Sequence, residues 1–127
     1  MIEAVSAIVI NNKKMLATRN RGLDVLFIPG GKIENGEMPQ DALVRELREE
    51  LGSGIKSCKY YDTFVAQAHM KNDKVRSRSF FVELEDSPVA SSEVEELVWL
   101  DKNNYTKLKL GNILVAMIPR LVSQGYL

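Results

Sequence analysis

The 127-residue chain is 45% hydrophobic and 27% charged, as is typical of one soluble globular domain, so we expect a single domain over residues 1–127. Seventeen basic residues balance seventeen acidic ones, which excludes a general attraction to nucleic acid or to membrane surfaces. The single cysteine, Cys58, excludes an internal disulfide, and the lack of a signal-like start or a long apolar segment favours a cytoplasmic protein.

The first part of the chain alternates turn residues with apolar runs rich in β-branched residues, a pattern typical of strands. Strands are predicted over residues 3–10, 15–19 and 25–28. We expect the first two to form a hairpin around the turn at 11–14. A helix is predicted over 39–51, because Pro39 suits a first helical turn and Gly52 suits the position after the last turn.

The second part of the chain continues with strands and ends in a helix. Strands are predicted over residues 59–70, 77–84 and 95–100. The turn at 71–74 joins the first two as a second hairpin. Apolar residues at helical spacing predict an amphipathic helix over 109–123, in which Pro119 would introduce a kink. Two helices placed to cover strands predict an α/β fold, an α/β/α sandwich around a mixed β-sheet.

The helix at 39–51 gathers three glutamates, Glu46, Glu49 and Glu50, on one arc and in its second half. Like charges at these spacings destabilise a helix by about 0.2–0.5 kcal/mol per pair, and the helix dipole disfavours anions in the last turn by about 0.3–1 kcal/mol each. A bound cation reverses both effects. The arc expected to face the core holds Leu43, Val44, Leu47 and Leu51.

The chemistry of these glutamates indicates a particular class of ion. Their ligand atoms are all oxygen, with no histidine or cysteine nearby, which favours Mg²⁺ or Mn²⁺ over Zn²⁺. Mg²⁺ usually shares its ligands with a phosphate, so we expect a phosphorylated substrate. The pair Gly30-Gly31 supports this interpretation, because glycines let the backbone approach a ligand closely.

The spacing around the glutamates resembles the signature box of the Nudix hydrolases. The segment 31–52 reads GKIENGEMPQDALVRELREELG, and eight specified positions match: Gly31, Glu37, Arg45, Glu46, Leu47, Glu49, Glu50 and Gly52. At background frequencies of about 5–10% per residue type, a chance match is rarer than about one in a million chains. One position departs from the box, because Ser53 stands where an aliphatic residue normally follows the last glycine; we expect Ile55 to supply that core contact.

The resemblance implies a Nudix-type fold and an enzyme that hydrolyses a nucleoside diphosphate linked to a further group X, with Mg²⁺ or Mn²⁺ bound. The Gly30–Glu34 start of the box looks like the branch that converts nucleoside triphosphates to the monophosphate and pyrophosphate. Three other substrates stay open: ADP-ribose, a dinucleotide polyphosphate and a sugar nucleotide. A non-catalytic, nucleotide-sensing module is the alternative from another functional class. The expected partner is a small-molecule nucleotide, and both a monomer and a homodimer stay open.

Carried onto this chain, the resemblance implies four metal ligands, the Gly30 carbonyl and the carboxylates of Glu46, Glu49 and Glu50. It also implies that Arg45 and Glu37 hold the preceding loop and the helix in register. The resemblance leaves the general base open between a box glutamate, for which Glu46 is the first candidate, and a distal acid before the last strand, for which Glu93 is the first candidate; Glu93 is also explained as a solvated loop acid. Glu95 and Glu96 are its neighbours.

Four arginines are candidates for substrate binding: Arg19, Arg21, Arg76 and Arg78. The first two follow a strand at a place where related enzymes often present a basic residue to the nucleotide. The last two alternate on a strand, so they share one face. Each has a simpler explanation as a solvated surface charge. Trp99 is a candidate for base stacking or for the core, and His69 is expected to be structural or solvated.

Overall fold

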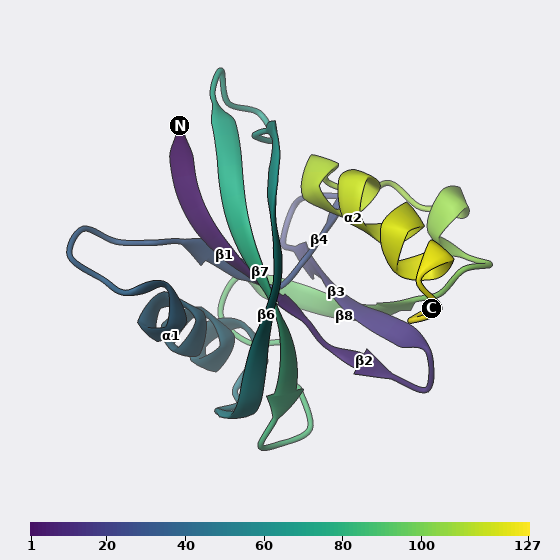
Figure 1. The fold of residues 1–127 in the computed structure, drawn as a ribbon, viewed down its shortest axis with the longest axis horizontal. Coiled ribbons are helices and arrows are strands. Elements are labelled where there is room, and N and C mark those ends of the chain that lie inside the picture. Colours follow the sequence, from purple (N-terminus) through teal and green to yellow (C-terminus); the bar gives the residue numbers. More distant parts are fainter.

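The computed structural model describes residues 1–127 and has an α/β architecture (Figure 1). In chain order the elements are β1 (Ile2–Ile8), β2 (Ile10–Asn11), β3 (Lys14–Asn20), β4 (Leu26–Phe27), β5 (Gly30–Lys32), α1 (Pro39–Leu51), β6 (Ile55–Gln67), β7 (Lys74–Leu84), β8 (Val94–Leu100), the 3-10 turn η1 (Tyr105–Lys107) and α2 (Asn112–Ser123). Two helices pack on mixed sheets, which confirms the predicted fold class. Neither helix is long and apolar enough to cross a bilayer.

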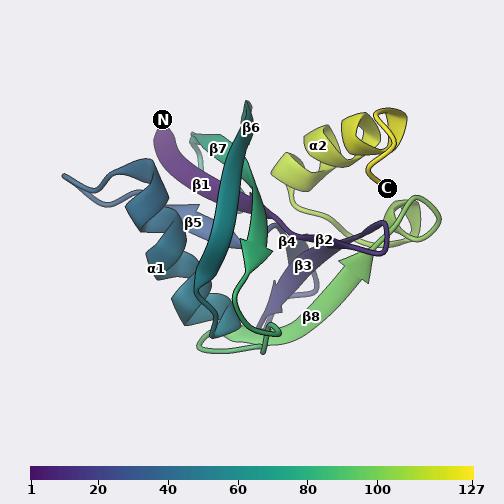
Figure 2. The same ribbon diagram turned by 60° about the horizontal axis from the view of Figure 1, so that its bottom comes forward.

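The strands divide between two sheets of four strands each. The first sheet has the order β5-β1-β7-β6, in which β1 and β7 run parallel and the other neighbours run antiparallel. The second sheet is built around β3, which pairs antiparallel with β2, β4 and β8. Figure 2 shows the two sheets diverging, with α1 beside β5 and β1 of the first sheet.

Of the two predicted hairpins, the second is confirmed, because β6 and β7 pair along their whole length. The first forms differently, since β1 pairs with β5 and β7, and only its short continuation β2 pairs with β3. Because β5 and β7 occupy both edges of β1, the N-terminal segment pairs with β3 only after Ile8. There the N–H of Leu16 donates to the carbonyl of Val9 at 2.9 Å. The N-terminal segment therefore contributes to both sheets.

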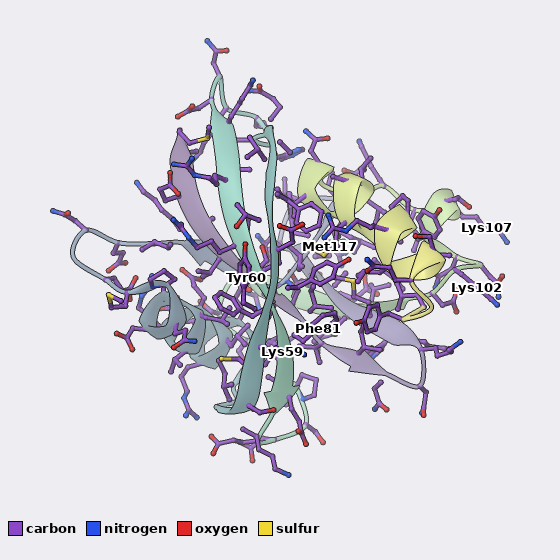
Figure 3. All side chains as sticks on the ribbon, in the orientation of Figure 1. Lys59, Tyr60, Phe81, Lys102, Lys107 and Met117 are labelled. Atoms are coloured by element: carbon purple, nitrogen blue, oxygen red, sulfur yellow. The ribbon has the colours of Figure 1, made fainter.

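Two apolar clusters hold the helices onto the strands. One cluster includes Leu47 of α1 and Val5 of β1, and the other includes Met117 of α2 with Phe81 of β7 at its edge. Figure 3 labels Met117 and Phe81 within the folded body, whereas the exposed Lys102 lies at the periphery. Each helix therefore covers its own part of the strands.

Helix α1 has the predicted bounds, and its two ends explain them. Pro39 occupies the first turn, where a missing N–H breaks no helical hydrogen bond. Gly52 follows the helix with a left-handed φ of 65°, and its N–H donates to the Arg48 carbonyl at 3.2 Å. The helix therefore begins and ends where the local sequence directs it.

The core-facing arc of α1 differs from the prediction. Val44 is 44% exposed, and the buried residues are Ala42, Leu43, Leu47 and Leu51. At about 100° per residue, Glu46 and Glu50 fall inside the angular range that these four residues span. The helix therefore turns two of its three clustered glutamates partly inward, and only Glu49 is exposed.

Three further details of the fold concern β5 and α2, and of these only the position of Pro119 inside α2 was predicted. Strand β5 contains Gly30 and Gly31, which are weak strand formers, yet it pairs with β1. Helix α2 begins at Asn112 because the preceding residues pair with β4; the Leu26 N–H donates to the Lys109 carbonyl at 2.9 Å. Pro119 lies inside α2 on its exposed side.

Ser53, the residue that departs from the box, is fully buried and satisfied by hydrogen bonds. Its hydroxyl donates to the Gly54 carbonyl at 2.8 Å and accepts the N–H of Asp86 at 3.0 Å. Ile55 packs against the cluster under α1, in the way expected for the missing aliphatic contact. The serine therefore ties α1 to the turn after β7 instead of filling the core.

Candidate active site

Two glycines in β5 bring strand and helix together. Gly30 has a φ of 141°, and a Cβ atom on it would overlap the carbonyl oxygen of Val5 in β1. A Cβ atom on Gly31 would lie 2.5 Å from the carboxyl carbon of Glu46 in α1. Strand β5 therefore fits between β1 and α1 because these two positions carry no side chain.

A cavity of about 260 Å³ lies at the C-terminal half of α1. Its lining is mainly acidic and polar, and consists of Asn20, Glu46, Glu49, Glu50, Ser92, Glu93 and Val94. Three of the four carboxylates come from α1, and the fourth comes from the segment that leads into β8. No cationic side chain is part of this lining. The structure thus brings the three box glutamates and the distal acid Glu93 to one space.

Glu50 is the most strongly perturbed acid in this cavity. Burial raises its pKa from the ordinary 4.5 to about 8, and the carboxylates of Glu46, Glu49 and Glu93 add to the increase. The N–H of Gly30 donates to Glu50 Oε1 at 3.0 Å and opposes the increase. Glu50 therefore holds its proton near neutral pH unless a positive charge enters the cavity.

Glu46 is perturbed in the same direction but has a cationic partner. Burial raises its pKa above 4.5, while the hydrogen bond from Arg45 opposes that increase. The Arg45 guanidinium donates to Glu46 Oε1 at 2.8 Å. The carboxylate of Glu46 is therefore oriented by an arginine on one side and faces the cavity on the other.

Arg45 also holds the loop that connects β5 to α1. Its guanidinium donates to both carboxylate oxygens of Glu37 at 2.9 Å, and to the Lys32 carbonyl at 3.1 Å. The hydrogen bonds from Arg45 and from the Glu34 N–H lower the pKa of Glu37 to about 2. This network links strand, loop and helix through one guanidinium.

The donor chemistry of the acidic cavity fits a hard divalent cation, because carboxylate oxygens are the ligands that Mg²⁺ and Mn²⁺ prefer. Burial and mutual repulsion raise the pKa of Glu46 and Glu50, and a bound cation would relieve both effects. The side chains do not already form a ligand set, since no three acidic, histidine or cysteine side chains converge on one point. Glu46 is turned toward Arg45 and Glu50 toward Gly30, so common ligation requires side-chain rotation within the cavity.

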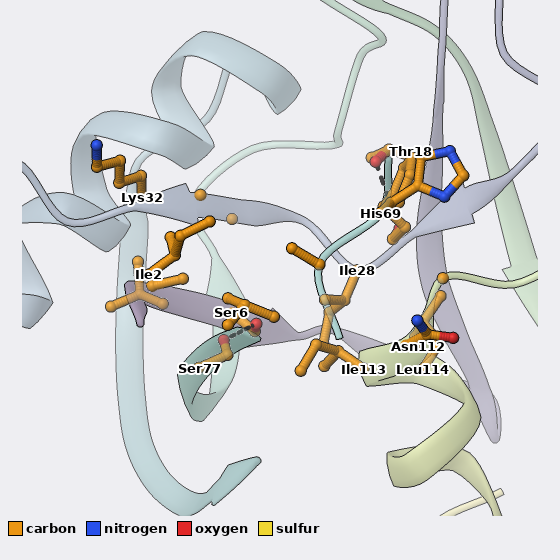
Figure 4. Close-up of a pocket in the computed structure, with 18 of the residues that line it drawn as sticks. Ile2, Ser6, Thr18, Ile28, Lys32, His69, Ser77, Asn112, Ile113 and Leu114 are labelled. Atoms are coloured by element: carbon orange, nitrogen blue, oxygen red, sulfur yellow. Dashed lines mark hydrogen bonds between the residues drawn. The ribbon is translucent and has the colours of Figure 1, made fainter. Parts of the chain in front are cut away.

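A larger cavity of about 440 Å³ lies next to the acidic one and is lined by residues of both sheets and α2. Figure 4 shows Ser6 and Ser77, which form a hydrogen-bonded pair, together with Asn112 and Ile113 from the start of α2. In the same lining, the His69 ring packs edge-on against Phe27, with 5.3 Å between ring centroids. The lining combines apolar surface with a few polar groups, which is typical of a small-molecule site.

The structure does not bring Arg19 or Arg21 into either cavity. Arg19 pairs with Glu96 at 3.0 Å and with Glu95 at 3.5 Å across β3 and β8. The guanidinium of Arg21 donates to the Ser92 carbonyl. These two arginines therefore stabilise the second sheet and the segment before β8, and Glu95 and Glu96 are not part of the acidic cavity's lining.

Arg76 and Arg78 also lie outside both cavities. They flank Ser77 on β7, and because side chains alternate along a strand, they point to the opposite side from this cavity-lining serine. Both arginines pair with Glu3, at 2.6 Å and 3.2 Å. Trp99 packs against the cluster under α1 and lines neither cavity.

Several cavity residues were not identified from the sequence, namely Ser6, Asn20, Phe27, Ser77 and Asn112. His69 was expected to be structural or solvated, and it is an exposed residue that is part of the larger cavity's lining. These residues come from separate strands, turns and a helix start, so no local pattern links them. Strand alternation could have indicated two of the cavity's lining residues. Thr18 and Asn20 flank Arg19 on β3, so they share the face opposite to that of Arg19, and both line the larger cavity.

Sequence comparisons agree with this geometry. A family model described as NUDIX domain matches residues 2–121. The chain is 44% identical over 54 residues to the 8-oxo-dGTP diphosphatase of Proteus vulgaris, which covers 42% of this chain and 46% of that protein. It is 48% identical over 54 residues to the 8-oxo-dGTP diphosphatase of Escherichia coli K12, which covers 39% and 41%. The aligned region thus spans less than half the length of these curated relatives.

The fold also matches solved structures over nearly its whole length. The solution structure of the Escherichia coli ORF135 protein is similar with a TM-score of 0.77 and 27% sequence identity. The match covers 98% of this chain and 93% of that one.

Proposed function

Because the chain belongs to the NUDIX domain family, we propose that it is a Mg²⁺- or Mn²⁺-dependent pyrophosphohydrolase that converts a nucleoside triphosphate to the monophosphate and pyrophosphate. One observation carries this proposal: an acidic cavity opens beside a larger, mostly apolar cavity, and Glu50 lines both. The apolar cavity suits a base and sugar, and the acidic cavity suits a diphosphate held through a divalent ion.

The proposed function gives the residues of the acidic cavity two roles, metal binding and positioning. Glu46, Glu49 and Glu50 would hold the ion, with the Gly30 carbonyl as a further candidate ligand. When bound, the ion would supply positive charge where negative charge develops on the phosphate oxygens. Arg45 would keep Glu46 oriented and would hold the loop of Glu37 against α1. Glu46 and Glu50 would rotate within the cavity to share the ion, while the hydrogen bonds of Arg45 to Glu37 would keep the loop and the helix in register.

Two residues are candidates for the general base that accepts a proton from the attacking water. Glu46 is held by Arg45 at one wall of the acidic cavity. Glu93 lines the same cavity from the segment before β8, where its carbonyl accepts the N–H of Arg21 at 3.0 Å. An enzyme whose general base is replaced by glutamine should still bind substrate, but its rate should no longer increase with pH. The pH profiles of Glu46→Gln and Glu93→Gln therefore decide between them.

The curated relatives are described as 8-oxo-dGTP diphosphatases, so we propose 8-oxo-dGTP as the first substrate to test. The size of the larger cavity and its lining suit a purine base, because the lining includes apolar and aromatic groups such as Phe27 and hydrogen-bonding groups such as Asn112. ADP-ribose, a dinucleotide polyphosphate and a sugar nucleotide are the competing substrates. They share the diphosphate and differ in the group beyond it.

A substrate panel with Mg²⁺ tests the proposal. The purified chain would be incubated with 8-oxo-dGTP, the common nucleoside triphosphates, ADP-ribose, a dinucleotide polyphosphate and a sugar nucleotide, and the products would be identified by chromatography. We expect a nucleoside triphosphate to give the highest kcat/KM, with monophosphate and pyrophosphate as products. Preferred cleavage of another class would overturn the substrate assignment. Nucleotide binding without turnover under Mg²⁺ or Mn²⁺ would favour the non-catalytic module.

A further inference from the structure

Asn20 occupies the junction between the two cavities. Of all the lining residues, only Asn20 and Glu50 belong to both the 260 Å³ and the 440 Å³ cavity. Asn20 is the last residue of β3, and the register with β8 shifts between Arg19 and Asn20. A ligand that extends from one cavity into the other would therefore lie beside Asn20 and Glu50.

The amide of Asn20 is free to bind such a ligand. Its side chain is partly buried and makes no hydrogen bond to the rest of the protein, unlike the hydroxyl of Thr18, which donates to the Phe27 carbonyl at 3.4 Å. Strand alternation turns Arg19 toward the acids of β8 and turns Asn20 toward the cavities. Asn20 is thus a neutral hydrogen-bond donor at the junction. Its neighbours Arg19 and Arg21 already bind other groups, Arg19 the acids of β8 and Arg21 the Ser92 carbonyl.

The chemistry of the surroundings decides what this donor would bind. Four carboxyl groups line the acidic cavity, and apart from them only Asn20 and Ser92 have a side-chain hydrogen-bond donor. If these donors were absent, the charged protein groups facing a phosphate in this cavity would all be carboxylates, which repel it. Asn20 alone of these two donors reaches the cavity proposed for the base and sugar.

We propose that Asn20 Nδ2 donates a hydrogen bond to a non-bridging oxygen of the phosphate attached to the sugar, and so sets where the nucleotide crosses from one cavity to the other. This inference rests on the proposed function, which places the base and the diphosphate on opposite sides of the junction. Because the amide is neutral, the nearby glutamates would not form an ion pair with it, as they would with an arginine or a lysine, and it would stay available to the phosphate.

Binding of a monophosphate tests the contact without requiring turnover. The probes are dGMP and its phosphate-free counterpart deoxyguanosine, titrated in Mg²⁺ against the wild-type chain and its variants by calorimetry. Asn20→Ala should weaken dGMP binding roughly tenfold and leave deoxyguanosine binding within about twofold. Asn20→Asp keeps the shape of the side chain and places a carboxylate against the phosphate, so it should weaken dGMP binding further.

A matched control is Asn103→Ala, which removes an exposed amide, also without a side-chain hydrogen bond, in the turn after β8. Equal dGMP affinity in Asn20→Ala, Asn20→Asp and the control would overturn the proposal, as would an equal loss for deoxyguanosine or no dGMP binding by the wild-type chain. If Asn20→Ala does not fold, the isosteric Asp variant decides. Failure of the proposed function would be seen separately, as absence of triphosphate hydrolysis by the wild-type chain.

Discussion

Gly31 and Glu46 approach so closely that a Cβ atom on the glycine would lie 2.5 Å from the glutamate's carboxyl carbon. Gly31 does not have a left-handed φ, so the need for glycine here comes from this close approach and not from the backbone conformation. Strand β5 and helix α1 can place a carboxylate against a backbone only where no side chain intervenes. The acidic cavity therefore depends on an absent side chain as much as on the glutamates.

Gly31→Ala should displace the Glu46 carboxylate and lower kcat/KM by about 100-fold, the effect expected when a catalytic group moves by about 1 Å. The control is Gly125→Ala, at a left-handed φ of 86° with no neighbouring atom within 4 Å. That variant should lower Tm through backbone strain and leave kcat/KM unchanged. A normal kcat/KM in Gly31→Ala would show that the carboxylate does not need its present position.

Replacing any one of Glu46, Glu49 or Glu50 by glutamine should reduce kcat by about 100-fold or more while the chain stays folded, because a ligand oxygen loses its charge. Higher Mn²⁺ concentrations should recover part of the activity. Glu95→Gln is the matched control, since its carboxylate pairs with Arg19 outside the cavity. Steady-state kinetics over a range of metal concentrations would check this, and unchanged turnover in Glu49→Gln and Glu50→Gln would argue against the metal assignment.

Arg45 and Glu37 should be energetically coupled. Arg45→Lys cannot reproduce the two parallel hydrogen bonds to Glu37, so it should destabilise the chain by about 1–2 kcal/mol. A double-mutant cycle with Glu37→Gln, measured by urea unfolding, should give a coupling energy of about 1 kcal/mol. The exposed pair Lys56 and Glu83, at 3.4 Å, serves as the comparison and should show almost no coupling. Equal coupling in the two cycles would contradict a special role for Arg45.

The stability of the metal-free protein should fall as pH rises because of Glu50. The pKa of Glu50 is about 8 in the folded chain and near 4.5 in the unfolded chain, so between these values the unfolded state releases a proton that the folded state keeps. Its contribution to stability is fully present below pH 4.5 and is lost as pH rises through about 8. Glu50→Gln removes this titration.

With chelator present, Glu50→Gln should therefore gain in Tm relative to wild type by a few degrees between pH 5 and pH 8. Glu46, Glu49, Glu93 and the Gly30 N–H face the same space and remain in both proteins, so the difference isolates Glu50. Thermal unfolding at several pH values measures it. A Tm difference that does not change with pH would mean that Glu50 titrates normally.

The sequence predicted the fold class and α1 well because their signals are local. Pro39 and Gly52 mark the ends of α1, and the spacing of the box identified the three glutamates that now line one cavity. The buried arc was misplaced, since it includes Glu46 and Glu50 and leaves Val44 exposed. Helical spacing gives the relative angles of side chains, whereas the neighbouring strands decide which arc is buried.

The rest of the site could not be predicted because it is assembled from distant segments. Asn20, Phe27 and Ser77 come from three different strands, and each has an ordinary local sequence. The arginines were chosen by charge, yet Arg19 and Arg76 are paired with acids that are distant in sequence. The charge of an arginine does not indicate whether its guanidinium is available to a substrate. The strand pairing decides this, because it places an acidic side chain beside each of these arginines.

The most direct test of the central claim is to locate the ion. Crystals grown with Mn²⁺ and a non-hydrolysable nucleoside triphosphate analogue would be measured for anomalous scattering. The account predicts a Mn²⁺ peak within about 2.5 Å of carboxylate oxygens from at least two of Glu46, Glu49 and Glu50, next to the phosphates. A peak bound only elsewhere, or nucleotide phosphates in the acidic cavity with no Mn²⁺ beside these glutamates, would contradict it.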